Sequence, residues 1–85
     1  MFIIRFYFSS FQDYSRVGYD SYSISYSIIP DVKKRDEDDF EVPEQFTLEQ
    51  ARELAKRMKK CMEENGYGGG LAYRYALEGM GVKID

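Results

Sequence analysis

Hydrophobic and polar residues alternate most regularly over residues 21–29, which read Ser-Tyr-Ser-Ile-Ser-Tyr-Ser-Ile-Ile. A β-strand sends successive side chains to opposite faces of a sheet. The pattern therefore predicts a strand whose tyrosines and isoleucines are buried on one face. The opposite face, formed by Ser23, Ser25 and Ser27, meets either water or a binding partner.

Two further stretches alternate in the same way. Residues 2–9 carry Phe or Ile at every second position, namely Phe2, Ile4, Phe6 and Phe8, and are also apolar on the other face near their start, which predicts a central strand. Residues 71–78 predict a third strand, whose large side chains are Leu71, Tyr73, Tyr75 and Leu77. A second helix is the alternative for this stretch, because Tyr73, Ala76, Leu77 and Met80 also have helical spacing.

Apolar residues recur every three or four positions over residues 48–64, which predicts an amphipathic helix. Thr47 and Gln50 fit a capping box at its start, and Gly66 suits a left-handed cap at its end. The predicted apolar stripe consists of Leu48, Ala51, Leu54, Ala55, Met58, Cys61 and Met62. Together these elements predict an α+β fold: a three-stranded antiparallel sheet, in the chain order β-β-α-β, with one helix packed on one face.

The length of 85 residues indicates one domain, 1–85, with a small core. Residues 31–46 form an acidic linker in which seven acids face three bases, a local charge of −4. The whole chain carries −3, so the remaining residues are close to neutral. This balance disfavours direct binding to nucleic acids or anionic membranes and favours a basic protein partner.

The chain has one Cys and no His, which excludes several kinds of chemistry within a single copy. It cannot form a Cys/His zinc site, an internal disulfide or a His-activated nucleophile. The acids cluster in the linker rather than across a pocket, so we expect no catalysis, no cofactor and no metal. Cys61 is expected to be a buried hydrophobe. The apolar start, residues 1–8, is too short for a signal peptide or membrane span, and a cytoplasmic location is the simplest expectation.

The acidic run is the main candidate for an interaction site. Acidic side chains can dock on a surface rich in Arg and Lys, whereas the alternative is a solvated loop. Aromatic residues of the connection between the first two strands are expected to assist. The predicted contact residues are Asp36, Glu37, Asp38, Asp39, Glu41, Glu44, Tyr14 and Tyr19.

Two other modes of binding remain open from the sequence. The chain could form a homodimer through an exposed sheet edge or its serine face. It could also bind nucleic acid weakly through a basic stripe on the helix, formed by Arg52, Lys56, Lys59 and Lys60. The glycine-rich residues 66–70 follow a helix, whereas a phosphate-binding loop leads into one, so we predict a simple turn.

The small size, the short sheet with one capped helix, the bias toward acidic residues and Tyr, and the lack of a catalytic set resemble small phage-encoded accessory proteins. The chain is similar in type to anti-CRISPR and other anti-defence inhibitors, several of which block nucleic-acid sites on a host effector with an acidic surface. The resemblance covers the whole chain and carries no signature motif. It implies binding to a basic, nucleic-acid-binding effector in the host-cell cytoplasm, through Asp36–Asp39, Glu41 and Glu44.

Overall fold

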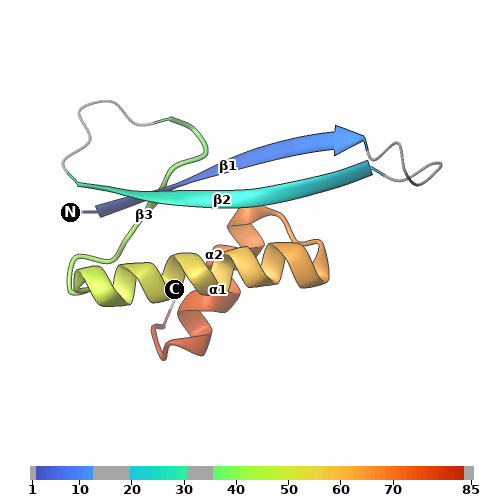
Figure 1. Cartoon of the computed structure of the whole chain (residues 1–85). Coiled ribbons are helices and arrows are strands. Elements are labelled where there is room, and N and C mark those ends of the chain that lie inside the picture. Colours follow the sequence, from blue (N-terminus) through green and yellow to red (C-terminus); the bar gives the residue numbers. More distant parts are fainter. Residues whose placement is uncertain (1, 13–19, 31–35, 84–85) are drawn as a thin grey trace.

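A computed structural model describes residues 2–12, 20–30 and 36–83 of the chain (Figure 1). The elements follow one another as three strands and then two helices. They are β1 (Phe2–Gln12), β2 (Asp20–Pro30), β3 (Phe40–Glu41), α1 (Leu48–Asn65) and α2 (Gly69–Gly79). Both strands predicted near the N-terminus are confirmed, and both are longer than the alternation alone indicated.

The strands form one antiparallel sheet in the order β2-β1-β3. β1 and β2 pair along their whole length, from Phe2 opposite Pro30 to Gln12 opposite Asp20. β1 is central, as its two apolar faces predicted. The α+β class and the three-stranded antiparallel sheet are therefore confirmed.

The third strand comes from a different part of the chain than the alternation predicted. Residues 40 and 41, inside the acidic linker, pair with Ile4 and Ile3 of β1. Residues 71–78 instead belong to the helix α2, so the prediction of a strand there is wrong and the chain order is β-β-β-α-α. The alternative of a second helix is the correct one.

The packing of α2 explains this outcome. Its buried residues are Ala72, Ala76 and Leu77, which share one face of a helix but would divide between the two faces of a strand. Two alanines on that face let α2 lie close to α1, because a small side chain allows two helices to approach. Tertiary contact with α1 therefore decides between two patterns that the sequence fits equally well.

The helix α1 begins and ends as predicted. Thr47 Oγ1 accepts from the Gln50 N–H at 3.2 Å, and Gln50 Oε1 accepts from the Thr47 N–H at 2.8 Å, which completes the capping box. Gly66 adopts the left-handed conformation, with φ of 68°, and its N–H donates to the Met62 carbonyl. Two residues of the predicted apolar stripe are not fully buried: Leu48 is 41% exposed, and Cys61 is only partly buried.

The core lies between one face of the sheet and the two helices. Ile4, Phe6 and Ile24 are buried on this face, whereas Ser25 and Ser27 are exposed on the other. The serine face is thus open at these two positions, and the side chain of Ser23 lies outside the description. Phe8 is 64% exposed, although it lies near Met62 and the glycines that join the two helices. The hairpin extends past the end of the helical layer (Figure 1).

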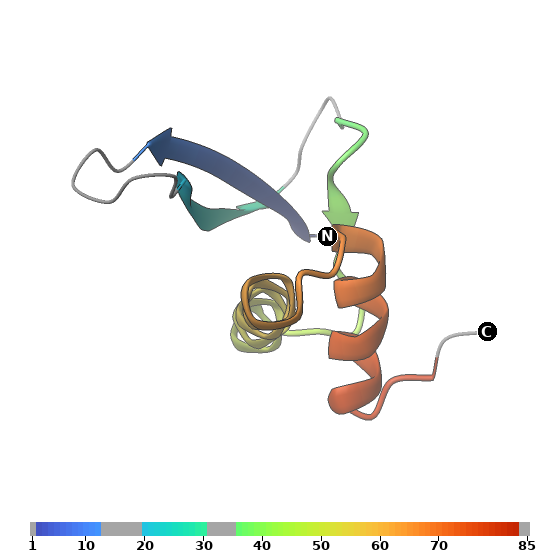
Figure 2. The same ribbon diagram turned by 90° about the vertical axis from the view of Figure 1, so that its right-hand side faces the viewer.

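Aromatic rings connect the sheet to α2. Phe6 packs edge-on against both Tyr26 and Phe40, and Phe40 stacks on Tyr73 with ring centroids 5.5 Å apart. The Phe40 ring also lies so close to Gly69 that a Cβ there would be 2.7 Å from Cζ. Figure 2, which looks along α1, shows the resulting layers: α1 lies below the hairpin, and α2 crosses beside it below β3.

Candidate functional site

The acidic segment is fixed to the sheet by one cation, Arg5 of β1. Arg5 Nε donates to Asp39 Oδ1 at 2.8 Å and Arg5 Nη2 donates to Asp39 Oδ2 at 2.7 Å, a bidentate pair. The Asp39 side chain is fully buried, and that of Arg5 is one-quarter exposed. The hydrogen bonds to Asp39 are the main reason that the pKa of Arg5 is raised above its ordinary value, with burial opposing them. Arg5 is therefore a permanent cation.

A short turn closes over this ion pair. The Asp36 N–H donates to Asp39 Oδ2 at 2.9 Å, and the Asp39 N–H donates to the Asp36 carbonyl at 3.2 Å. The Asp36 carboxylate also approaches Arg5 Nη2 at 3.4 Å while remaining 63% exposed. Side-chain bonds of an Asp to its own loop backbone are a common way to hold a turn. Asp39 is therefore the base of the turn, and Glu37 and Asp38 are at its tip.

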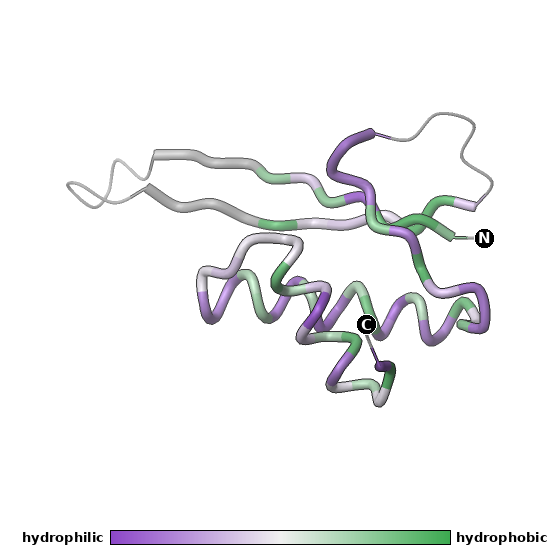
Figure 3. The backbone as a smooth tube through the Cα atoms, turned by 180° about the vertical axis from the view of Figure 1, so that it is seen from behind, coloured by the Kyte–Doolittle hydropathy of each residue, from purple (hydrophilic) through white to green (hydrophobic). Residues whose placement is uncertain are grey.

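The predicted contact residues fall into three groups. Five acids lie exposed on the segment that runs from the turn through β3 toward α1: Asp36, Glu37, Asp38, Glu41 and Glu44. Figure 3 shows the hydrophilic stretch at the turn, next to the hydrophobic start of β1. Asp39 differs from these acids because its carboxylate faces inward and positions the turn. Tyr14 and Tyr19 lie outside the described residues.

Arg5 is the functional residue that sequence reasoning missed. It interrupts an otherwise apolar stretch, and the alternation of that stretch indicates no partner for it. One signal could have identified it: Arg is the residue best suited to bind a carboxylate through two hydrogen bonds. It is also the one charged residue between Phe2 and Ser9, in a chain with a nearby acidic run.

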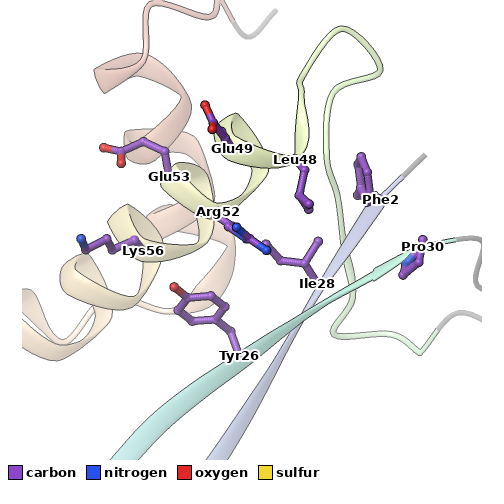
Figure 4. A pocket seen from close by; sticks show the side chains of 9 residues that line it. All are labelled: Phe2, Tyr26, Ile28, Pro30, Leu48, Glu49, Arg52, Glu53 and Lys56. Carbon is purple, nitrogen blue, oxygen red and sulfur yellow. The ribbon is translucent and has the colours of Figure 1, made fainter.

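A second surface feature is a groove between β2 and α1, with a volume of about 700 Å³. Phe2, Tyr26, Ile28, Pro30 and Leu48 form its apolar floor, and α1 contributes Glu49, Arg52, Glu53 and Lys56. Figure 4 shows Tyr26 and Ile28 projecting from β2 toward α1, and Arg52 reaching from α1 toward Ile28. The groove explains why Leu48 is not buried: it lies at the open side of the helix.

The basic stripe predicted on α1 is divided in the structure. Arg52 and Lys56 line the groove beside β2. Lys59 Nζ lies 3.9 Å from Glu63 Oε1. Lys60 lies near Tyr75, on the side of α1 that faces α2. The stripe is therefore not one continuous basic surface, and acids are interspersed with it. This arrangement weakens the hypothesis of nucleic-acid binding, which needs a coherent positive patch.

The glycine-rich residues 66–70 differ from the prediction in one respect. They were expected to be a simple turn because they follow a helix, but α2 begins at Gly69, so the segment also leads into one. No Lys-Ser or Lys-Thr pair follows, and the N-cap Gly68 offers no side chain. The close approach of Gly69 to Phe40 gives the glycine at this position a structural explanation.

Residues 2–12, 20–30 and 36–83 contain no group of three Cys, Asp or Glu side chains arranged to hold a metal ion. Within the same ranges, neither helix combines the length and apolar character that crossing a membrane requires. Comparisons of the chain with protein-family models, curated proteins and solved structures gave no match.

Proposed function

We propose that this chain is a non-enzymatic binding module that docks on a basic surface of another protein through its acidic segment, residues 36–44. The observation that carries the proposal is the bidentate Arg5–Asp39 pair, which fixes the turn. A solvated linker needs no such anchor. A docking loop gains from one, because a segment held in place loses less conformational entropy when it binds.

The distribution of charge supports the same proposal. Asp36, Glu37 and Asp38 are exposed at the turn, while Arg5, on the same face of the sheet as Ser27, neutralises the buried carboxylate of Asp39. Acids that remain exposed can steer a basic partner toward the turn and orient it. The surface complementary to these acids is one rich in Arg and Lys on another protein, such as the nucleic-acid site of an effector.

An inhibitor of the anti-CRISPR or anti-defence type would act in this way, by occupying a surface that otherwise binds a nucleic-acid backbone. Such an inhibitor binds in a fixed ratio and needs no catalytic residues. We place its action in the cytoplasm, where host effectors that bind nucleic acids are found. Nucleic-acid binding by the chain itself receives no comparable support, because the basic residues of α1 are dispersed.

The test compares wild type with the double variant Glu37→Lys/Asp38→Lys, both immobilised and exposed to an extract of the native host. This variant reverses the tip of the turn and leaves Asp36, Asp39 and Arg5 in place. A matched control, Glu64→Lys/Glu78→Lys, makes the same change in net charge at exposed sites on the two helices. The captured proteins are identified by mass spectrometry, and binding of the purified partner is then measured at low and high salt.

We expect wild type and the control to capture the same basic protein and the turn variant to lose it. The association rate with wild type should fall as salt increases, since screening weakens interactions between exposed charges. Capture that is unchanged in the turn variant would overturn the proposal. Equal loss in the control would do so as well, because net charge rather than the turn would then explain binding.

A further inference from the structure

The outer edge of β2 has no neighbouring strand among the described residues. The sheet order β2-β1-β3 leaves β2 paired on one side only, along 11 residues. An open edge of this length presents a row of backbone donors and acceptors that can pair with another strand. The other edge of the sheet, beside β1, is covered in part by β3.

The hydrogen-bond pattern shows which residues present these groups. The Phe2 carbonyl accepts from the Val42 N–H, so Phe2 directs its backbone groups away from β2. In an antiparallel pair of strands, the backbone N–H and C=O groups of two opposite residues either point toward each other or both point away from the pair. Pro30 lies opposite Phe2 and Ile28 lies opposite Ile4, so their backbone groups face outward. The same parity applies to Tyr26, and the open edge therefore offers groups of residues 26, 28 and 30.

The same three residues border the groove. Tyr26 and Ile28 are half-buried on its floor, and the exposed Leu48 completes the apolar surface. A strand added to the edge of β2 would cover this floor with its own side chains. The edge and the groove are thus parts of one surface.

The charges on α1 indicate what could fit this surface. Glu49, Arg52, Glu53 and Lys56 line the groove, two acids and two bases. An acidic peptide would meet Glu49 and Glu53, and a basic peptide would meet Arg52 and Lys56. In an antiparallel second copy of α1, Glu49 would face Lys56 and Arg52 would face Glu53, because both pairs share a midpoint between residues 52 and 53. The pattern is complementary to itself.

The ion pairs already present allow this arrangement. Among the described residues, Glu49, Arg52 and Lys56 form no ion pair, whereas Glu53 Oε1 accepts from Arg57 at 2.9 Å. A carboxylate has two oxygens and can accept from two cations. Glu53 can therefore keep Arg57 and also meet Arg52 of a second copy.

We propose that the groove is the contact surface of a homodimer, in which β2 pairs antiparallel with β2 of a second copy. A twofold axis perpendicular to the sheet near Ile28 satisfies both elements, because Figure 4 places Ile28 beside Arg52, at the midpoint of the α1 charges. Around this axis Ile28 meets its own copy, and Tyr26 meets Pro30, whose carbonyl accepts from the Tyr26 N–H. Pro30 has no N–H to return, so the Tyr26 carbonyl bonds to water at each end of the pairing. The result is a continuous six-stranded sheet with both α1 helices on one face. This proposal uses a different surface from the acidic segment and does not depend on it.

The first test is the mass of the full chain in solution at tens of micromolar, by sedimentation equilibrium. We expect a dimer of the 10.0 kDa chain. Lys56→Glu places like charges opposite each other at two symmetric positions and should raise the dimer dissociation constant by about tenfold or more. The double variant Glu49→Lys/Lys56→Glu restores opposite charges and should return the constant to within about threefold of wild type. Both positions are exposed, and circular dichroism checks that each variant is folded.

The second test locates the axis by cross-linking in a Cys61→Ala background. Directly opposite residues that exchange backbone hydrogen bonds have Cα atoms about 5.5 Å apart, within the range of a disulfide. Ile28→Cys should form a disulfide-linked dimer on oxidation, whereas Ser25→Cys, exposed and away from the axis, should not. A wild-type chain that stays monomeric at tens of micromolar would overturn the proposal. So would a dimer that Lys56→Glu leaves intact, or one in which the double variant fails to restore what Lys56→Glu removes.

Discussion

The two helices are stabilised in different ways. α1 has a complete capping box at Thr47 and a left-handed glycine at its end, so its limits are set by adjacent residues. α2 begins with Gly68 as its N-cap and has glycines at its first two positions, which are poor helix formers. Its stability comes from buried Ala72, Ala76 and Leu77 and from Tyr73, which contacts β3. Local signals therefore set the two ends of α1, which also packs on the core, whereas α2 lacks such signals and depends on tertiary contacts alone.

The largest expected effect follows from removing the main buried side chain of α2. Leu77 is 3% exposed, and Leu77→Ala should lower the free energy of unfolding by about 2–5 kcal/mol, since it creates a cavity. Amide hydrogens of α2 should then exchange faster, with a larger change than those of α1. Denaturant unfolding and hydrogen exchange measure both effects.

The control for this variant is Leu71→Ala on the same helix. Leu71 is 42% exposed, so its replacement should change stability by no more than about 0.5 kcal/mol. Equal acceleration of exchange in both helices after Leu77→Ala would contradict the idea that α2 depends more on packing than α1.

Alanine substitutions at two adjacent glycines, Gly69 and Gly70, distinguish the effect of packing from that of helix propensity at the start of α2. In Gly69→Ala the new Cβ would lie 2.7 Å from Phe40 Cζ, and the ring would have to leave its stack on Tyr73. Overpacking of this kind costs about 1–3 kcal/mol, more than the roughly 1 kcal/mol that Ala gains over Gly in a helix. In Gly70→Ala the Cβ meets nothing within 4 Å, so only the gain remains. The temperature of thermal unfolding should fall in Gly69→Ala and rise in Gly70→Ala. Stabilisation by both variants would refute the packing argument.

The sequence predicted those parts of the fold that adjacent residues determine. Alternation over residues 21–29 identified β2, and Thr47 with Gln50 located the start of α1. β3 has two residues, Phe40 and Glu41, which is too short to produce an alternating pattern. For residues 71–78 two periodicities were present, and only the approach of Ala72 and Ala76 to other elements decided between them.

The candidate site was predicted in part for the same reason. The acids of residues 36–39 form a visible run, so the segment was identified. The inward orientation of Asp39 depends on Arg5, 34 positions earlier, and on the register of β3 against β1. The groove joins β2 to α1, which are also distant in sequence. Spacing along the chain carries no information about either contact.

The caps provide a smaller test of the contrast between the helices. Thr47→Ala removes one side-chain acceptor from the start of α1 and should cost about 1 kcal/mol. Gly68 has φ of −69° and ψ of 163°, the conformation of a normal N-cap, and space for a side chain. Gly68→Ser should therefore supply the missing cap of α2 and stabilise the protein by a few tenths of a kcal/mol. A loss of stability in Gly68→Ser would show that this end of α2 requires glycine.

The smallest effect concerns the hydroxyl that connects α2 to β3. Tyr73 donates to the Glu41 carbonyl at 2.6 Å, and Tyr73→Phe should cost about 0.5–1 kcal/mol at neutral pH. Burial, followed by the charge of Glu41, raises the pKa of Tyr73 above its ordinary value of 10.0. Above pH 10 the unfolded chain releases this proton while the folded chain retains it, so rising pH favours unfolding. The stability difference between wild type and Tyr73→Phe should therefore be constant below pH 10 and shrink above it. A difference that stays constant to pH 11 in denaturant titrations would mean that the folded and unfolded chains ionise Tyr73 alike, and that the contact between α2 and β3 is looser than the structure indicates.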